Sequence, residues 1–310
     1  KKPVITEEEN MTQISEFILL GFGNLHGLQF LLFGVFLVIY MVTLLGNILI
    51  LIVVLADHSL HSPMYFFLGH FSFLEIVYIT TIEPMMLRTL LSAHVPVSFS
   101  GCACQFYFFA ALVATECFLL AVMSYDCYIA ICSPLHYSSI MDYWGCLQLA
   151  GASWGAGFLA PILLMVLIFQ LTFCDANKID HFFCDLKPIM KLCCADNQVT
   201  EMTSFIRTSL FALGPFLLTL ASYTRIISTI LRISSIIGKQ RTFSTCSSHL
   251  IVISLYYGTL GIVYGFPSGP QNEDLLKFLS LLYTVLMPAL NPIIYTLRNR
   301  DVKVALIKWV

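Results

Sequence analysis

Of the acidic side chains that stand inside long apolar stretches of the sequence, two are expected at a similar depth. Glu75 lies 12 residues after Pro63, near the start of the second stretch, and Glu116 lies 11 residues before Cys127, near the end of the third. At 1.5 Å per helical residue, both carboxyl groups are expected roughly 16 to 18 Å from the same membrane face. Two carboxyl groups close together in a low dielectric need a proton or a cation between them. The spacing predicts a Na⁺ or H⁺ site; the alternative is two protonated acids that hydrogen-bond to their neighbours and hold the helices together.

A third acid, Asp126, lies between Tyr125 and Tyr128 near the end of the third apolar stretch. Pro134 follows within ten residues. Because proline lacks an N–H and restricts the residue before it, the helix is expected to end near Ser133. Asp126 and its two tyrosines are therefore predicted at a helix end on a water boundary.

The elements that must position these residues are membrane helices. Of the 310 residues, 58% are hydrophobic and 11% are charged, whereas about 25% charged residues is usual in a soluble domain. A bilayer core about 30 Å thick requires roughly 20 apolar residues per helix. We therefore predict an all-α, seven-transmembrane helix bundle, with residues 1–310 forming one domain and residues 1–27 preceding the first span. The seven stretches are 28–55, 64–91, 102–132, 146–171, 202–233, 243–266 and 275–297.

The distribution of charge predicts how the chain is oriented. Basic residues gather after the fifth and seventh stretches, and acids gather before the first and after the fourth. The positive-inside rule then places the N-terminus outside and the C-terminus in the cytoplasm. Asn10 begins an Asn-Met-Thr sequon, which is useful for glycosylation only on the outer side. In residues 299–309 basic and apolar residues alternate at helical spacing. This pattern predicts a short amphipathic helix that lies on the inner leaflet of the membrane and contacts its lipid.

Four motifs resemble those of one receptor family. They are Leu-His-Ser-Pro-Met-Tyr-Phe-Phe-Leu at 60–68, Asp-x-Tyr at 126–128 with Ala-Ile-Cys-x-Pro-Leu-His-Tyr after it, Thr-Phe-Ser-Thr-Cys-Ser-Ser-His-Leu at 242–250, and Pro-Ala-Leu-Asn-Pro-Ile-Ile-Tyr at 288–295. At this spacing the chain resembles the odorant receptors, a branch of the rhodopsin-like G-protein-coupled receptors.

The resemblance implies a function. It implies a receptor that binds small odorants and activates a stimulatory, olfactory-type heterotrimeric G protein to raise cAMP. The implied location is the plasma membrane of olfactory neuron cilia. A trafficking chaperone is implied as a further partner. Glu75 and Asn291 match the sodium-binding residues of rhodopsin-like receptors, so Na⁺ is the one cofactor implied. An enzyme is not expected, because no nucleophile, base and orienting group share a depth. An ion transporter or channel using Glu75 and Glu116 is an alternative, although no inverted repeat is present.

The resemblance also implies a ligand pocket in the outer half of the bundle. Mostly apolar walls suit a small, weakly polar ligand. At Arg207 the family predicts an apolar residue. This guanidinium is expected either to pair with a carboxylate or carbonyl of the ligand, or to extend toward the loop acids. The positions that match ligand-contacting ones are Phe109, Ala110, Val113, Ala114, Arg207, Phe211, Tyr257, Leu260, Tyr264, Leu281 and Thr284.

Cys127 departs from the family, which has an arginine there that engages the G protein. Cysteine carries no positive charge and is a weak donor. Two outcomes stay open: coupling through the remaining contact residues, or a receptor that binds odorants but signals weakly or not at all. The switch and G-protein residues that the resemblance implies are Asp126, Cys127, Tyr128, Tyr223, Arg241, Asn291, Pro292 and Tyr295.

The chain has eleven cysteines, which position separates into two groups. Those at the inner ends of helices face a reducing cytosol and are expected to be free. The resemblance implies a Cys102–Cys184 disulfide that ties the long loop after the fourth stretch to the third, and a Cys174–Cys194 disulfide within that loop. A copper or zinc site at His181 and Cys184 is a further reading, which no ligand spacing supports.

Overall fold

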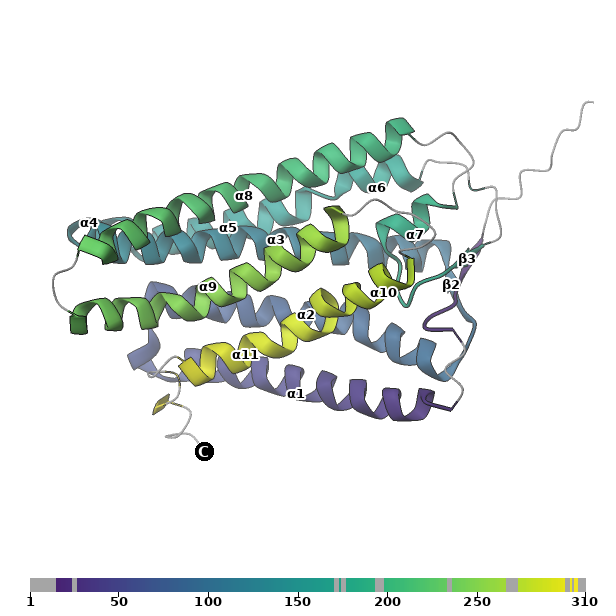
Figure 1. The fold of residues 1–310 in the computed structure, drawn as a ribbon, viewed down its shortest axis with the longest axis horizontal. Helices are drawn as coiled ribbons and strands as arrows, with labels where there is room; N and C mark the ends of the chain where they lie inside the picture. The colour runs from purple at the N-terminus through teal and green to yellow at the C-terminus, as the bar shows by residue number, and fades with distance from the viewer. Residues whose placement is uncertain are drawn as a thin grey trace, which may run out of the picture.

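Seven helical segments lie side by side in a bundle (Figure 1). The computed structural model describes residues 15–23, 27–169, 173, 177–192, 198–232, 236–265, 273–298, 302 and 304–305. It does not describe the side chains of 169, 198–212, 236–245, 248, 264–265, 273 and 296–298. Within these ranges six segments are long and apolar enough to span a membrane, and the sixth in sequence, α9, carries a shorter apolar run, His249–Val263. The segments are α1 (Gln29–Ala56), α2 (Pro63–Leu91), α3 (Phe99–Cys132), α5 with α6 (Tyr143–Leu159 and Ile162–Phe169), α8 (Gln198–Arg232), α9 (Ile236–Gly265), and α10 with η2 and α11 (Glu273–Leu281, Leu282–Leu286 and Met287–Arg298).

The helix ends differ from the apolar stretches by a few residues, because capping groups set them. The third helix begins at Phe99 rather than at residue 102, since the Ser98 hydroxyl accepts a hydrogen bond from the Gly101 amide at 3.1 Å. The fourth begins at residue 143 rather than 146, where the Asp142 carboxylate accepts from the Gly145 amide at 2.7 Å. Such side-chain acceptors satisfy amides that have no partner within the helix.

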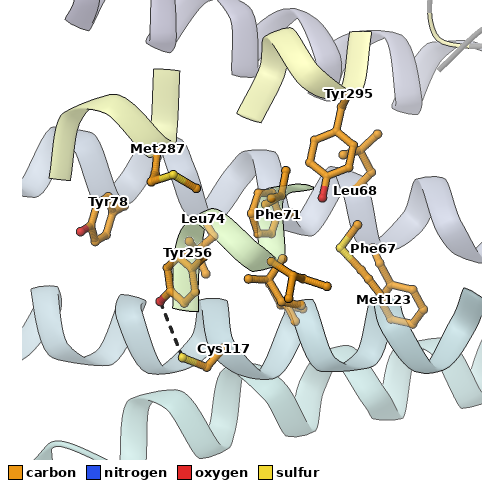
Figure 2. Packing of buried hydrophobic residues seen from close by; sticks show 14 of the residues in the cluster. Phe67, Leu68, Phe71, Leu74, Tyr78, Cys117, Met123, Tyr256, Met287 and Tyr295 are labelled. Atoms are coloured by element: carbon orange, nitrogen blue, oxygen red, sulfur yellow. Dashed lines mark hydrogen bonds between the residues drawn. The ribbon is translucent and has the colours of Figure 1, made fainter. Parts of the chain in front are cut away.

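Helix α3 is the centre of the bundle. It packs against α2, α5, α8 and α9, while α1 and α11 pack on one another. The main apolar core contains buried residues from α1, α2, α3, α8, α9 and α11. Figure 2 shows part of this core, with Phe67, Phe71 and Leu74 on α2 and Met123 on α3. Every site residue on α3 is therefore held by contacts on several sides.

A small sheet covers one end of the bundle, which we call the lid end (Figure 1). Strand β1 (Glu16–Leu19) pairs antiparallel with β2 (Val95–Ser98) and parallel with β3 (Lys178–Ile179). The apolar stretches did not predict it, because its strands are very short. Short helix α7 (Leu186–Met190) follows β3. Helix α4 (Pro134–Ile140) lies at the opposite end, beyond Asp126; we call this the Asp126 end.

Two helices are interrupted. The fourth segment is divided at Pro161 into α5 and α6, since proline cannot donate a backbone hydrogen bond. In the seventh segment α10 passes through the π-helical turn η2 before α11. Beyond α11, Val302, Val304 and Ala305 are helical; Val302 and Ala305 are buried and Val304 is exposed. Their three-residue spacing fits the predicted amphipathic helix.

At Gly157, α5 lies in close contact with α3. A Cβ atom there would lie 2.0 Å from the Thr115 hydroxyl and 2.7 Å from the Thr115 Cα. The clash with the Thr115 Cα cannot be relieved by a change of side-chain rotamer, because that atom belongs to the backbone. We therefore expect Gly157→Ala to lower the free energy of unfolding by at least about 1 to 3 kcal/mol. The measurement is the melting temperature of the detergent-purified receptor, which should fall by several degrees. Gly155→Ala is the matched control, since its Cβ would meet nothing within 4 Å; equal melting temperatures for the two variants would contradict the close approach.

Candidate functional site

A buried polar cluster lies between α2, α3 and α11. Glu75, Glu116 and Asn291 are 0%, 3% and 1% exposed. The Asn291 side-chain amide donates a hydrogen bond to Glu75 Oε1. Glu116 interacts electrostatically with Glu75 and with Tyr256. The structure thus brings together the two acids and the asparagine that the sequence singles out.

Three oxygens of this cluster have no hydrogen-bond partner among the described residues. They are Glu75 Oε2, Asn291 Oδ1 and the Tyr295 hydroxyl, all buried. Tyr295 packs edge-on against Phe71, with ring centroids 6.0 Å apart, and interacts electrostatically with both acids. In Figure 2 its hydroxyl points from α11 toward the space between α2 and α3. Buried polar atoms usually have partners, so this donor set is suited to a small cation or a proton.

Asp126 is held by a residue of the short helix that follows α3. Its carboxylate Oδ1 accepts a hydrogen bond from the Tyr137 hydroxyl of α4 at 2.9 Å, and Asp126 is 2% exposed. Burial, together with the nearby Asp126 carboxylate, raises the pKa of Tyr137, so the phenol stays protonated and acts as donor. α4 is thereby attached to the end of α3.

Cys127 points into the bundle, where it is buried. It interacts electrostatically with Cys246 of α9. Tyr223 of α8 and Tyr295 of α11 are within electrostatic range. Tyr223 in turn shares a 2.8 Å hydrogen bond with His249 Nδ1. The residues beside Asp126 therefore connect α3, α8, α9 and α11.

A second group of predicted residues lies nearer the lid end, where α3 faces α9. The Tyr256 hydroxyl donates to the Val113 carbonyl at 2.9 Å and accepts a long contact from the Cys117 thiol at 3.7 Å (Figure 2). Tyr257 is half-buried, its ring centroid is 5.0 Å from that of Phe216, and its hydroxyl donates to the Cys117 carbonyl at 3.4 Å. Half-buried side chains in the same region are those of Ala110, Val113, Ala114, Leu260 and Leu281.

Two members of the predicted pocket are engaged in packing. Phe109 is 3% exposed. Its ring centroid lies 4.9 Å from that of Phe183, between β3 and α7, and 6.1 Å from that of Tyr283. Thr284 is buried, and its hydroxyl donates to the Ser280 carbonyl of its own helix at 2.7 Å. In the structure both side chains are therefore buried in contacts with their neighbours.

The segment from β3 to α7, which we call the lid, is attached to the bundle by covalent and polar contacts. Cys102 and Cys184 form a disulfide with Cα atoms 5.5 Å apart, so the Cys184 sulfur is not available to a metal. The His181 Nε2 and the Ser280 hydroxyl are 3.1 Å apart. Burial, and then the charge of Lys277, lower the pKa of His181 to about 3, which keeps the imidazole neutral. Among the described residues no group of three or more His, Cys, Asp or Glu side chains is placed to hold a metal ion.

The sequence comparisons decide the family. The family model described as olfactory receptor matches residues 36–310. This chain belongs to the olfactory receptor family. Human (Homo sapiens) olfactory receptor 10A4 is 52% identical over 96% of this chain and 95% of its own length. Human olfactory receptor 10A5 is 52% identical over 96% and 94%, and human olfactory receptor 10A7 is 50% identical over 95% and 93%.

As an olfactory receptor the chain is a multi-pass membrane protein that senses odorants through a G protein, and its relatives are receptors rather than enzymes. The seven-helix prediction and the family prediction are confirmed. Some site predictions fall outside the described residues: Asn10, Cys174 and Cys194 entirely, and the side chains of Arg207, Phe211, Tyr264 and Arg241. Tyr128, on the last turns of α3, is half-buried, and Pro292 is buried in α11.

Three residues of this olfactory receptor site were missed by sequence reasoning. Tyr137 holds Asp126, Tyr256 joins α9 to α3, and Cys246 meets Cys127. Tyr256 could have been found from the sequence, because it places a hydroxyl group inside an apolar run. A buried hydroxyl needs a hydrogen-bond partner, so such a residue is a candidate for a contact between helices. The contact between Cys127 and Cys246 joins residues more than 100 positions apart, which no local pattern reports.

Proposed function

We propose that this olfactory receptor binds a small, weakly polar odorant between α3 and α9 and activates a stimulatory, olfactory-type heterotrimeric G protein that raises cAMP. The family match over nearly the whole chain supports the proposal most. The half-buried side chains around Tyr257 are the described ones that suit such a ligand; Arg207, Phe211 and Tyr264, whose side chains lie outside the described part, remain proposed contacts from the family resemblance. A ligand that binds better when α9 has moved shifts the receptor toward that state.

The lid end is proposed to face outward. Acids before α1 and after α6, and bases after α8 and α11, support this orientation by the positive-inside rule. Asn10 is then on the side where glycosylation occurs, and Cys174–Cys194 is the proposed second bridge of the lid. The proposed location is the plasma membrane of olfactory neuron cilia, reached with a trafficking chaperone.

A receptor that binds odorant but signals weakly is the second candidate. One observation favours it: Cys127 is buried, and it offers no positive charge at the Asp126 end. Tyr128, Leu135 and the basic residues of 232–241 would then have to contact the G protein alone. In the family, an arginine at this position performs that contact.

The test is cAMP output from cells that display the chain at their surface, stimulated with a mixed odorant panel rich in short carboxylic acids and carbonyls. A response above vector-transfected cells supports coupling, whereas odorant binding without cAMP supports the second candidate. Flux of Na⁺ or H⁺ into vesicles containing the purified chain would instead support an ion transporter or channel.

The polar cluster is proposed to bind Na⁺ in the inactive state, with Glu75, Glu116 and Asn291 as its oxygen donors. Binding to the folded state stabilises it by about 1.4 kcal/mol when Na⁺ is tenfold above its Kd. We therefore expect the purified receptor to melt a few degrees higher in NaCl than in choline chloride. Glu75→Gln can keep a hydrogen bond to Asn291 without its charge and should lose the difference. Equal melting temperatures of the unsubstituted receptor in both salts would contradict the site.

A further inference from the structure

One side chain of the lid reaches the end of α9. The Nζ of Lys187, on α7, donates a hydrogen bond to the Val263 carbonyl at 2.9 Å. Val263 lies in the last turn of α9, which ends at Gly265, and the last carbonyls of a helix have no donor within that helix. The regular partner of this carbonyl would be the amide of residue 267, which is a proline and has no N–H. Lys187 therefore supplies a donor that α9 itself cannot, and its positive charge suits the C-terminal end of a helix.

The backbone that carries Lys187 is fixed to α3. Cys184 is three residues earlier and forms the disulfide with Cys102 of α3. The Cys184 amide also donates a hydrogen bond to the side chain of Gln105 of α3 at 3.0 Å. Residues 184–187 thus form a short connection from α3 to the last turn of α9, which we call the lid strap.

Nearer the middle of α9, two tyrosines make a second set of contacts with α3. The hydroxyl groups of Tyr256 and Tyr257 donate to backbone carbonyls of α3 at 2.9 and 3.4 Å. Val263 is seven residues beyond Tyr256, and Cys246 is ten residues before it. At 1.5 Å per residue, these two arms of α9 are roughly 10 and 15 Å long.

The two arms are mechanically coupled, because α9 contains no proline that would kink it. A rigid helix that pivots at the two tyrosines moves its ends in opposite directions. If Cys246 moves by about 3 Å, Val263 moves by roughly 2 Å. A displacement of this size exceeds the narrow range of distances at which a hydrogen bond forms. The bond from Lys187 therefore has to break before α9 opens at the Asp126 end.

We propose that Lys187 is a positioning residue that, through the lid strap, holds the lid end of α9 against α3 and restrains α9 from opening at the Asp126 end. The bond stabilises the arrangement of α9 seen in the structure. Removal of the donor then shifts the population of receptors toward the open arrangement. The restraint stands on these contacts alone, whereas its effect on cAMP rests on the proposed function.

Opening of α9 can be measured without signalling, because Cys246 is a native reporter. Its thiol is free and 3% exposed, so a thiol reagent reaches it when α9 moves. The full receptor, purified in detergent, is treated with N-ethylmaleimide, and labelling of the peptide that contains Cys246 is followed by mass spectrometry. Lys187→Met keeps the apolar stem and removes the donor. We expect it to label about threefold to tenfold faster at Cys246 than the unsubstituted receptor.

Matched variants show whether the donor is responsible. Lys187→Arg keeps a charged donor and should label at nearly the rate of the unsubstituted receptor. Lys178→Met removes the same charge from β3, where the side chain is exposed, and should also leave the rate unchanged. Equal Cys246 labelling in Lys187→Met and the unsubstituted receptor would overturn the proposal. Equal acceleration in Lys178→Met would also overturn it, because the net charge of the lid would then explain the effect.

A second buried thiol reports whether a variant is folded. Cys146 of α5 is free and 4% exposed, so it should stay protected in every folded preparation. If Lys187→Met exposes Cys146 as well, Lys187→Gln takes its place, since its shorter, uncharged side chain cannot supply the same bond. Faster labelling of Cys246 with Cys146 protected supports the restraint, and an unchanged rate in folded Lys187→Gln overturns it.

Signalling is measured separately, in intact cells at equal surface expression. Lys187→Met should raise basal cAMP about threefold to tenfold, and Lys187→Arg should not. Faster labelling of Cys246 with unchanged basal cAMP, in a receptor that responds to odorant, would overturn the restraint as a regulator of signalling. An unsubstituted receptor that gives no cAMP with any odorant would count against the proposed function while leaving the labelling result as it stands.

Discussion

Replacing Cys127 with arginine is expected to raise cAMP output about tenfold or more, at equal surface expression. A hydrogen bond to a charged group contributes about 1.5 to 3 kcal/mol, and about 1.4 kcal/mol corresponds to a factor of ten in affinity. Arginine at position 127 would supply such bonds to the G protein and would also remove the contact with Cys246 that joins α3 to α9. The measurement is basal and odorant-evoked cAMP in intact cells.

The control for this substitution is Cys127→Gln, which has a long polar side chain without charge. If both variants gain equally, loss of the Cys246 contact explains the effect rather than the new charge. If the arginine variant reaches the surface and signals no better than the unsubstituted receptor, a residue other than Cys127 limits coupling to the G protein. Tyr137 is the next residue to test, because it holds the Asp126 carboxylate that arginine would otherwise pair with.

Loss of the Cys102–Cys184 disulfide is expected to be the most destabilising single change. The bond closes a segment with a sequence separation of 82 residues, and removing a native disulfide typically costs about 2 to 5 kcal/mol. It also positions the Cys184 amide, which donates to the Gln105 side chain at 3.0 Å. Cys102→Ser should therefore prevent most of the receptor from reaching the cell surface, as measured by antibody labelling of intact cells.

Cys104→Ser is the matched control for the disulfide prediction. This cysteine is two residues further along α3 but is exposed and free, so its replacement should leave surface labelling unchanged. Normal surface labelling of Cys102→Ser, with an unchanged melting temperature, would mean that the sheet and the contact between His181 and Ser280 hold the lid without the covalent bond.

The helices could be predicted because the bilayer imposes a simple requirement on composition. Long apolar runs gave seven spans at nearly the right places. Their ends were less accurate, because Ser98 and Asp142 cap helices outside the apolar runs. The lid sheet could not be predicted: β1 has four residues and β3 has two, so neither shows a periodicity.

The candidate site was predictable where burial of charge is costly. Helical rise alone placed Glu75 and Glu116 at one depth, and the structure shows them in electrostatic contact. The pocket was less predictable, because the sequence does not tell which face of an apolar helix packs inward. Phe109, for example, is buried and packs against Phe183. Tyr137 was missed because its partner, Asp126, lies on another helix.

The π-helical turn η2 constrains how the length of this chain can evolve. On its lid side Ser280 meets His181, and beyond it Asn291 meets Glu75. A helix turns about 100° per residue, so an insertion or deletion of one residue between Ser280 and Asn291 would rotate one of these contacts away from its partner. In a loop, the same insertion or deletion would change only the length of the connection. Gaps in an alignment of functional relatives should therefore avoid this interval.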